Sequence, residues 1–250
     1  MRVSLCMFAP LLFFCMPPGV LGNPITAPTI TVSVDGSPIS FPLTVTDLGT
    51  EWLFNGTDAL YSGTMFSGVL TLAGLLEPNP FLSYSFSATN ASTQTHTYSV
   101  QFAVTPPAGT QYYMASSTYS GTIQDGPSQP GVTLGVPSGQ THLQTVSASP
   151  LGHLTNLDLG TTCTSLGNGL CGGGPAITTA FAPTTLTTLD LALSFTLTGG
   201  SDYASILGSA TLIPVPEPGT WFLFACGLFL VAVPGLYQLL HAKNGHFFRH

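Results

Sequence analysis

The segments 81-FLSYSFSATN-90 and 95-THTYSVQFAVT-105 decide the fold, because apolar residues alternate with small polar residues along both of them. Successive residues of a β-strand point to opposite faces, so each segment predicts a strand with one apolar face and one face of hydroxyl groups. The polar segment 91-ASTQ-94 joins them. We therefore expect 81–90 and 95–105 to form a long antiparallel hairpin.

The same alternation recurs along the chain. It is clear in 29-TITVSV-34 and in 189-LDLALSFTLTG-199, which we expect to form a second hairpin with 203–213. Turn residues separate these segments, and no helical period appears between Asn23 and Ile213. The region 23–213 is therefore predicted to be an all-β sandwich of antiparallel strands, with a long loop at 149–175. Weaker strands are expected at 41–45, 66–72, 111–123, 142–148 and 176–181.

Charge is scarce and unevenly distributed. Charged residues make up 5% of the 250 residues, against about 25% in average proteins. The three basic residues, Arg2, Lys243 and Arg249, lie at the extreme ends, so the region between them is purely anionic at neutral pH. Binding to phosphate backbones or to anionic lipids depends on Lys and Arg. We expect no nucleic-acid partner.

The N-terminus has the three regions of a secretory signal. Arg2 supplies a positive charge, 3-VSLCMFAPLLFFCM-16 is apolar, and 17-PPGVLG-22 breaks the helix before a small residue. We expect a signal helix in 1–22 with cleavage after Gly22. An uncleaved anchor is the alternative, although about 14 apolar residues are short for a membrane span. A lipoprotein site at Cys15 is disfavoured by bulky Phe14.

The C-terminal region 214–250 contains a motif followed by an apolar segment. The motif is Val215-Pro216-Glu217-Pro218, and residues 220–240 after it carry no charge over a length that can cross a bilayer. The tail 241–250 holds Lys243 and Arg249, which the positive-inside rule places in the cytoplasm. We expect one transmembrane helix, with the β region outside.

This combination of features resembles the PEP-CTERM sorting signal of Gram-negative bacteria that make exopolysaccharide. The resemblance covers about the last 36 residues and implies processing by an exosortase near Pro216-Glu217-Pro218. The tail departs from the family pattern, because the usual compact Arg-rich cluster is replaced by a longer segment with two basic residues. A plain single-span membrane anchor is the alternative.

Few residues of the β region suggest chemistry. Cys163 and Cys171 form an even pair in an exported region and predict a disulfide. Nothing arranges His96, His142 or His153 for catalysis or for a metal, and there is no Gly-x-Ser-x-Gly motif. We expect no enzyme, no cofactor and no metal, although Asp35 and Asp58 are the best candidates for a calcium site.

Function is therefore predicted mainly from the two ends. We expect an exported, exosortase-sorted protein of the cell surface or extracellular matrix, associated with exopolysaccharide. The alternatives are a secreted carbohydrate-binding module, with Trp52, Tyr112 and Tyr113 as part of an aromatic platform, and a membrane-anchored surface protein. Because sheet edges are often protected by Lys and the β region has none, we also expect self-association near the pI of about 5.0.

Overall fold

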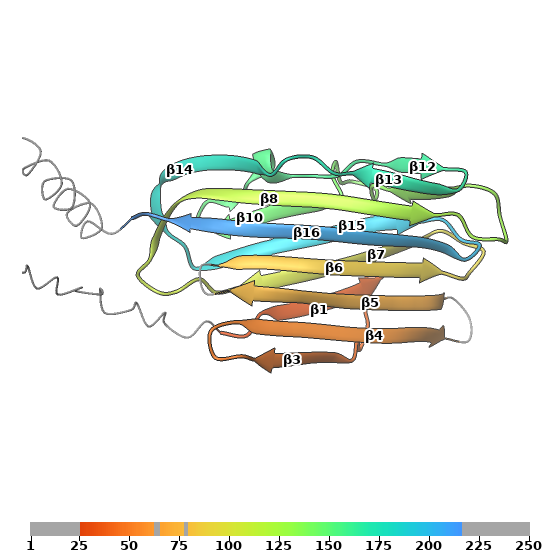
Figure 1. Cartoon of the computed structure of the whole chain (residues 1–250), viewed down its shortest axis with the longest axis horizontal. Helices are drawn as coiled ribbons and strands as arrows, with labels where there is room; N and C mark the ends of the chain where they lie inside the picture. The colour runs from red at the N-terminus through yellow and green to blue at the C-terminus, as the bar shows by residue number, and fades with distance from the viewer. Residues whose placement is uncertain (1–25, 63–65, 78–79, 217–250) are drawn as a thin grey trace, which may run out of the picture.

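The structure is a computed structural model, which describes residues 26–62, 66–77 and 80–216. These residues form two antiparallel β-sheets that pack face to face (Figure 1). The expected signal helix with Gly22, and Glu217, Pro218, the span 220–240 and the tail, lie outside the described residues. Within those residues no helix is long and apolar enough to cross a membrane.

The first sheet has eight strands. Six of them lie side by side in the order β11 (Gly152–His153), β10 (Gln144–Ser149), β15 (Thr188–Leu197), β7 (His96–Val104), β1 (Thr29–Val34) and β2 (Ser37–Pro38). The other two extend the sheet from β15, which pairs with β9 (Val132–Gly135), and β9 pairs in turn with β12 (Cys163–Ser165).

The second sheet also has eight strands. Seven follow the order β13 (Asn168–Gly172), β8 (Gln111–Gln124), β16 (Asp202–Pro214), β6 (Phe81–Asn90), β5 (Phe66–Glu77), β4 (Trp52–Ser62) and β3 (Leu43–Asp47). The eighth strand, β14 (Ile177–Thr185), pairs with β8 beyond the end of β13.

The core fills the space between the sheets, as the alternation predicts. Along β6 the buried residues Leu82, Tyr84, Phe86 and Ala88 alternate with half-buried serines. Aromatic rings join the two layers, because Phe102 of the first sheet lies 5.6 Å from Phe54 and 5.2 Å from Tyr84 of the second, centroid to centroid. The all-β prediction is confirmed.

Both predicted hairpins are wrong. Strand β6 pairs with β5 and β16, whereas β7 pairs with β1 and β15, so the segment 91–95 crosses from one sheet to the other. The short segment between β15 and β16 makes the same crossing. Alternation predicts which residues face the core, but it carries no information about which neighbour a strand pairs with.

The region expected to be a long loop is partly structured. Residues 149–175 contain β11, a 3-10 turn at Thr155–Leu157, β12 and β13. Cys163 and Cys171 are joined by a disulfide, with their Cα atoms 5.7 Å apart. Because β12 belongs to the first sheet and β13 to the second, this disulfide links the two layers.

Candidate functional site

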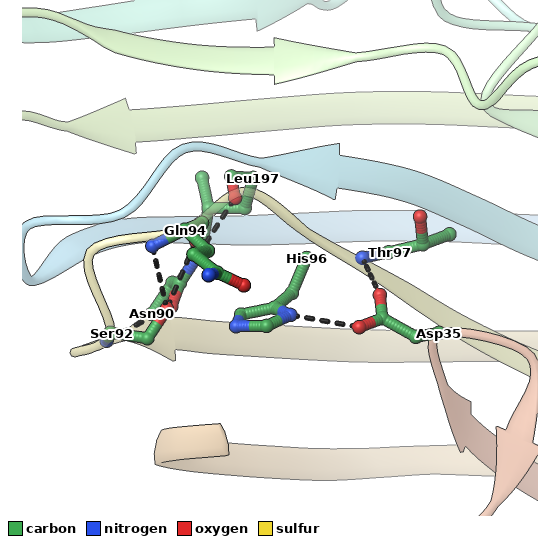
Figure 2. A network of polar contacts seen from close by, with 7 residues as sticks. All are labelled: Asp35, Asn90, Ser92, Gln94, His96, Thr97 and Leu197. Atoms are coloured by element: carbon green, nitrogen blue, oxygen red, sulfur yellow. Dashed lines mark hydrogen bonds and ion pairs between the residues drawn. The ribbon is translucent and has the colours of Figure 1, made fainter. Parts of the chain in front are cut away.

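A polar cluster lies where the chain crosses between sheets (Figure 2). The fully buried Asn90 side chain donates from Nδ2 to the carbonyl oxygens of Gln94 and Leu197, at 2.7 and 2.9 Å. Its Oδ1 accepts from the backbone N–H and the hydroxyl of Ser92. These bonds hold the 91–95 crossing against the end of β15, so we interpret the cluster as structural.

His96 completes this cluster on its other side. Its Nδ1 lies 2.8 Å from Asp35 Oδ2, and Asp35 Oδ1 accepts from the N–H of Thr97 (Figure 2). Asp35 has φ +49° and precedes Gly36 at φ +75°, which gives the tight turn between β1 and β2. His96 is only 4% exposed, so it is poorly placed to meet a substrate.

Two further histidines of the β region, His142 and His153, also contact an aspartate. Asp158, whose side chain is 4% exposed, lies 2.8 Å from His153 Nε2 and 3.8 Å from His142 Nδ1. In the described ranges, which contain no Lys or Arg, histidine is the one side chain that can offer these carboxylates a positive charge. These same ranges contain no group of three His, Cys, Asp or Glu side chains placed to hold a metal ion.

The structure separates the two residues that sequence favoured for calcium. Asp35 lies in the turn after β1 of the first sheet, where His96 and Thr97 bond to it. Asp58 lies in β4 of the second sheet, opposite Leu70 of β5. They do not form a joint site.

The predicted aromatic platform is also not assembled. Tyr112 is 1% exposed and belongs to the core, so its side chain is not part of an exposed aromatic surface. Trp52 is half-buried against the core on β4, while Tyr113 is half-buried on β8. Strands β5, β6 and β16 lie between β4 and β8, which puts the two side chains roughly 20 Å apart at about 4.8 Å per strand.

A shallow groove with a volume of about 570 Å³ lies on the outer face of the second sheet. We call it the outer groove. Its lining combines leucines with small hydroxyl residues and includes Leu53, Leu75, Leu207, Ser83, Ser209 and Thr118. No residue that lines the outer groove is charged.

The register of the strands explains this arrangement. Leu53 of β4 is opposite Leu75 of β5, which is opposite Ser83 of β6, and the row continues through Ser209 to Thr118. Directly paired residues share a face, so the row runs across the sheet with about 4.8 Å between strands. The hydroxyls of Ser209 and Thr118 are hydrogen-bonded to each other at 2.7 Å.

A buried hydrogen-bond network lies directly beneath the outer groove. Gln144 of the first sheet reaches across the core, where its Oε1 accepts from the Tyr84 hydroxyl at 2.5 Å. Its Nε2 donates to Ser117 Oγ at 2.6 Å and to the Thr118 carbonyl at 3.0 Å. Gly208 permits this approach, because a Cβ there would overlap Gln144 Oε1 and the Tyr84 hydroxyl. Burial raises the pKa of Tyr84 well above its usual range, so the phenol stays a neutral donor.

Sequence reasoning missed the outer groove, although one signal was present. In 203-YASILGSATLI-213 the outward positions are mostly polar, yet Leu207 shares their parity and is 54% exposed. Leu53, next to buried Phe54, is a similar exception at 39% exposed. Single exposed apolar residues are ordinary, but several that gather on one face mark a candidate interaction surface, and only the tertiary structure shows that these leucines gather.

Comparison with protein-family models, with curated proteins and with solved structures finds no match for this chain. The fold and the outer groove therefore define a class only: an all-β protein of two packed antiparallel sheets, with an uncharged groove on the outer face of the second sheet.

Proposed function

We propose that the protein is an exported cell-surface or extracellular-matrix protein, sorted through its C-terminus by an exosortase and associated with exopolysaccharide. The observation that carries this proposal is Val215-Pro216-Glu217-Pro218 followed by the uncharged span 220–240 and a basic end. The Val215 N–H donates to the Gln111 carbonyl at 2.8 Å, so the second sheet continues up to the motif. Cleavage just after Pro216 would leave both sheets complete.

The outer groove is the surface that we assign to the polysaccharide. The hydroxyls of Ser83 and Ser209 match the donors and acceptors of sugar hydroxyls, and the leucines offer apolar surface to the C–H faces of sugar rings. The region between Arg2 and Lys243 has no Lys or Arg to attract uronate or sulfate groups. The ligand expected is therefore a neutral glycan, bound weakly at each repeat and retained through many repeats.

The sorting half of the proposal predicts the ends of the mature chain. The measurement is intact mass with sequencing of both ends, on protein taken from the organism that makes it. We expect a chain that begins near Asn23 and ends near Pro216-Glu217-Pro218. A mature chain that keeps 221–250 would replace exosortase processing with a permanent membrane anchor.

The binding half predicts retention on a neutral polysaccharide. The full chain in mild detergent should sediment with cellulose. Leu207→Glu should weaken this retention roughly tenfold (about 1.4 kcal/mol of binding free energy), because it puts a charge into the lining of the outer groove. Leu166→Glu is the matched control, since Leu166 is 88% exposed and lies outside the outer groove. Equal retention of both variants, or stronger retention on alginate than on cellulose, would refute this assignment.

A further inference from the structure

Three of the four sheet margins carry features that prevent pairing with another chain. In the first sheet the outer strands are very short, with two residues in β2, two in β11 and three in β12. In the second sheet the margin beyond β8 consists of β14, which contains Pro183 and a register shift between Ala180 and Thr184, and of β13, which the disulfide joins to β12 of the first sheet. Very short strands, prolines and bulges are the means by which natural sheets avoid edge-to-edge association.

The fourth margin, β3, has none of these features. Its five residues, 43-LTVTD-47, contain no proline or lysine and pair with β4 without a register shift. All but Leu43 are exposed, and β3 pairs with no other strand of the described residues. Figure 1 shows β3 at the margin of the sheet, on the far side of β4 from β5. Its outward backbone N–H and C=O groups are therefore open to another strand.

We propose that β3 pairs antiparallel with β3 of a second copy, so that two sandwiches share one continuous sheet about a two-fold axis. The sequence of β3 is compatible with this arrangement. When Val45 is opposite Val45 of the second copy, Thr44 is opposite Thr46 and Leu43 is opposite Asp47. Opposed threonines stabilise antiparallel strands, and the two Asp47 carboxylates do not face each other.

The pairing places the outer faces of both second sheets on the same side, because directly opposed residues of a continuous sheet share a face. The two outer grooves of the dimer could then bind one polysaccharide chain together. This consequence rests on the proposed function, whereas the dimer itself does not. Five residues per copy bury much less than the roughly 1,200–2,000 Å² of a standard interface. The dimer is therefore expected to be weak in dilute solution and favoured where copies are concentrated on a surface.

The test compares three full chains in mild detergent by sedimentation over a concentration series that extends into the millimolar range. Val45→Lys puts a charge at the centre of β3. Ile177→Lys is the matched control, because the two side chains are equally exposed, Ile177 at 38% and Val45 at 37%. Ile177 lies on the margin formed by β14, which is protected from pairing. Wild type and Ile177→Lys should pass from monomer to dimer, while Val45→Lys stays monomeric. The same behaviour in all three chains, or loss of the dimer in Ile177→Lys alone, would overturn the proposal.

A covalent readout covers the case in which Val45→Lys fails to fold. Opposed Cα atoms of antiparallel strands lie about 4.5–5.5 Å apart, within the range that a disulfide spans. With Cys6, Cys15 and Cys226 replaced by serine, Val45→Cys should oxidise to a dimer, and Ile177→Cys should not. No dimer from Val45→Cys, or equal yields from the two variants, would refute pairing through β3. Neither readout involves polysaccharide, so failure here and failure of the proposed function are distinguishable.

Discussion

Replacing Gln144 with leucine is expected to lower the free energy of unfolding by roughly 3–5 kcal/mol. The Gln144 side chain is fully buried and carries the hydrogen bonds between the sheets to the Tyr84 hydroxyl, the Ser117 hydroxyl and the Thr118 carbonyl. Leucine has a similar size but no polar atom, and each orphaned buried group costs about 1–3 kcal/mol. Urea unfolding followed by circular dichroism measures the loss.

A double-mutant cycle separates the network from simple repacking. Tyr84→Phe should destabilise the wild type, because it leaves Gln144 Oε1 without its donor. In the Gln144→Leu background the same change should be neutral or stabilising, because it removes an orphaned hydroxyl. Thr145→Val, on the outward face of the same strand, should stay within about 0.5 kcal/mol of wild type. Additive effects of Gln144→Leu and Tyr84→Phe would show that the network contributes no coupling energy.

Removing the disulfide by changing both Cys163 and Cys171 to alanine is expected to cost about 2–3 kcal/mol. The disulfide closes a short loop, with a sequence separation of 8. The expected loss of stability is the free energy that corresponds to the chain entropy of closing a loop of this length. The bond also ties β12 of the first sheet to β13 of the second, so its loss should release the margin of the sandwich before the centre.

Two measurements check this prediction. Urea unfolding gives the total loss in the free energy of unfolding. Hydrogen exchange reports whether amides of β13 lose protection before those of β6. Thr164→Ala, within the same loop, is the control and should leave both measurements near wild type. An effect below about 0.5 kcal/mol, or uniform loss of protection across both strands, would contradict the role of a link between the layers.

The alternation of residue types predicted which side chains face the core. Along β6, β7, β15 and β16 almost every inward assignment holds, because burial of apolar side chains dominates the choice of face and the side-chain period of a strand is two. The disulfide between Cys163 and Cys171 was also predicted from the sequence, because these are the two cysteines of the β region and they form an even pair.

Pairing could not be predicted in the same way. The expected hairpin of 81–90 with 95–105 fits the alternation as well as the observed crossing does, since both arrangements bury the same residues. The side chain of Asn90, which bonds the 91–95 segment and the end of β15, is part of what holds the crossing. Its contacts come from segments far apart in the chain, which a local pattern does not report.

The sequence by itself therefore determined that this protein is all-β and that its outer faces are rich in hydroxyl groups, and it is the basis of the proposed export and sorting. The tertiary structure alone decided that Tyr112 is core, that Leu53, Leu75 and Leu207 meet around one groove, and that β3 is the unprotected margin. The physical reason is that burial acts residue by residue along a strand. Grooves and margins depend on which strands become neighbours, and long-range contacts decide that.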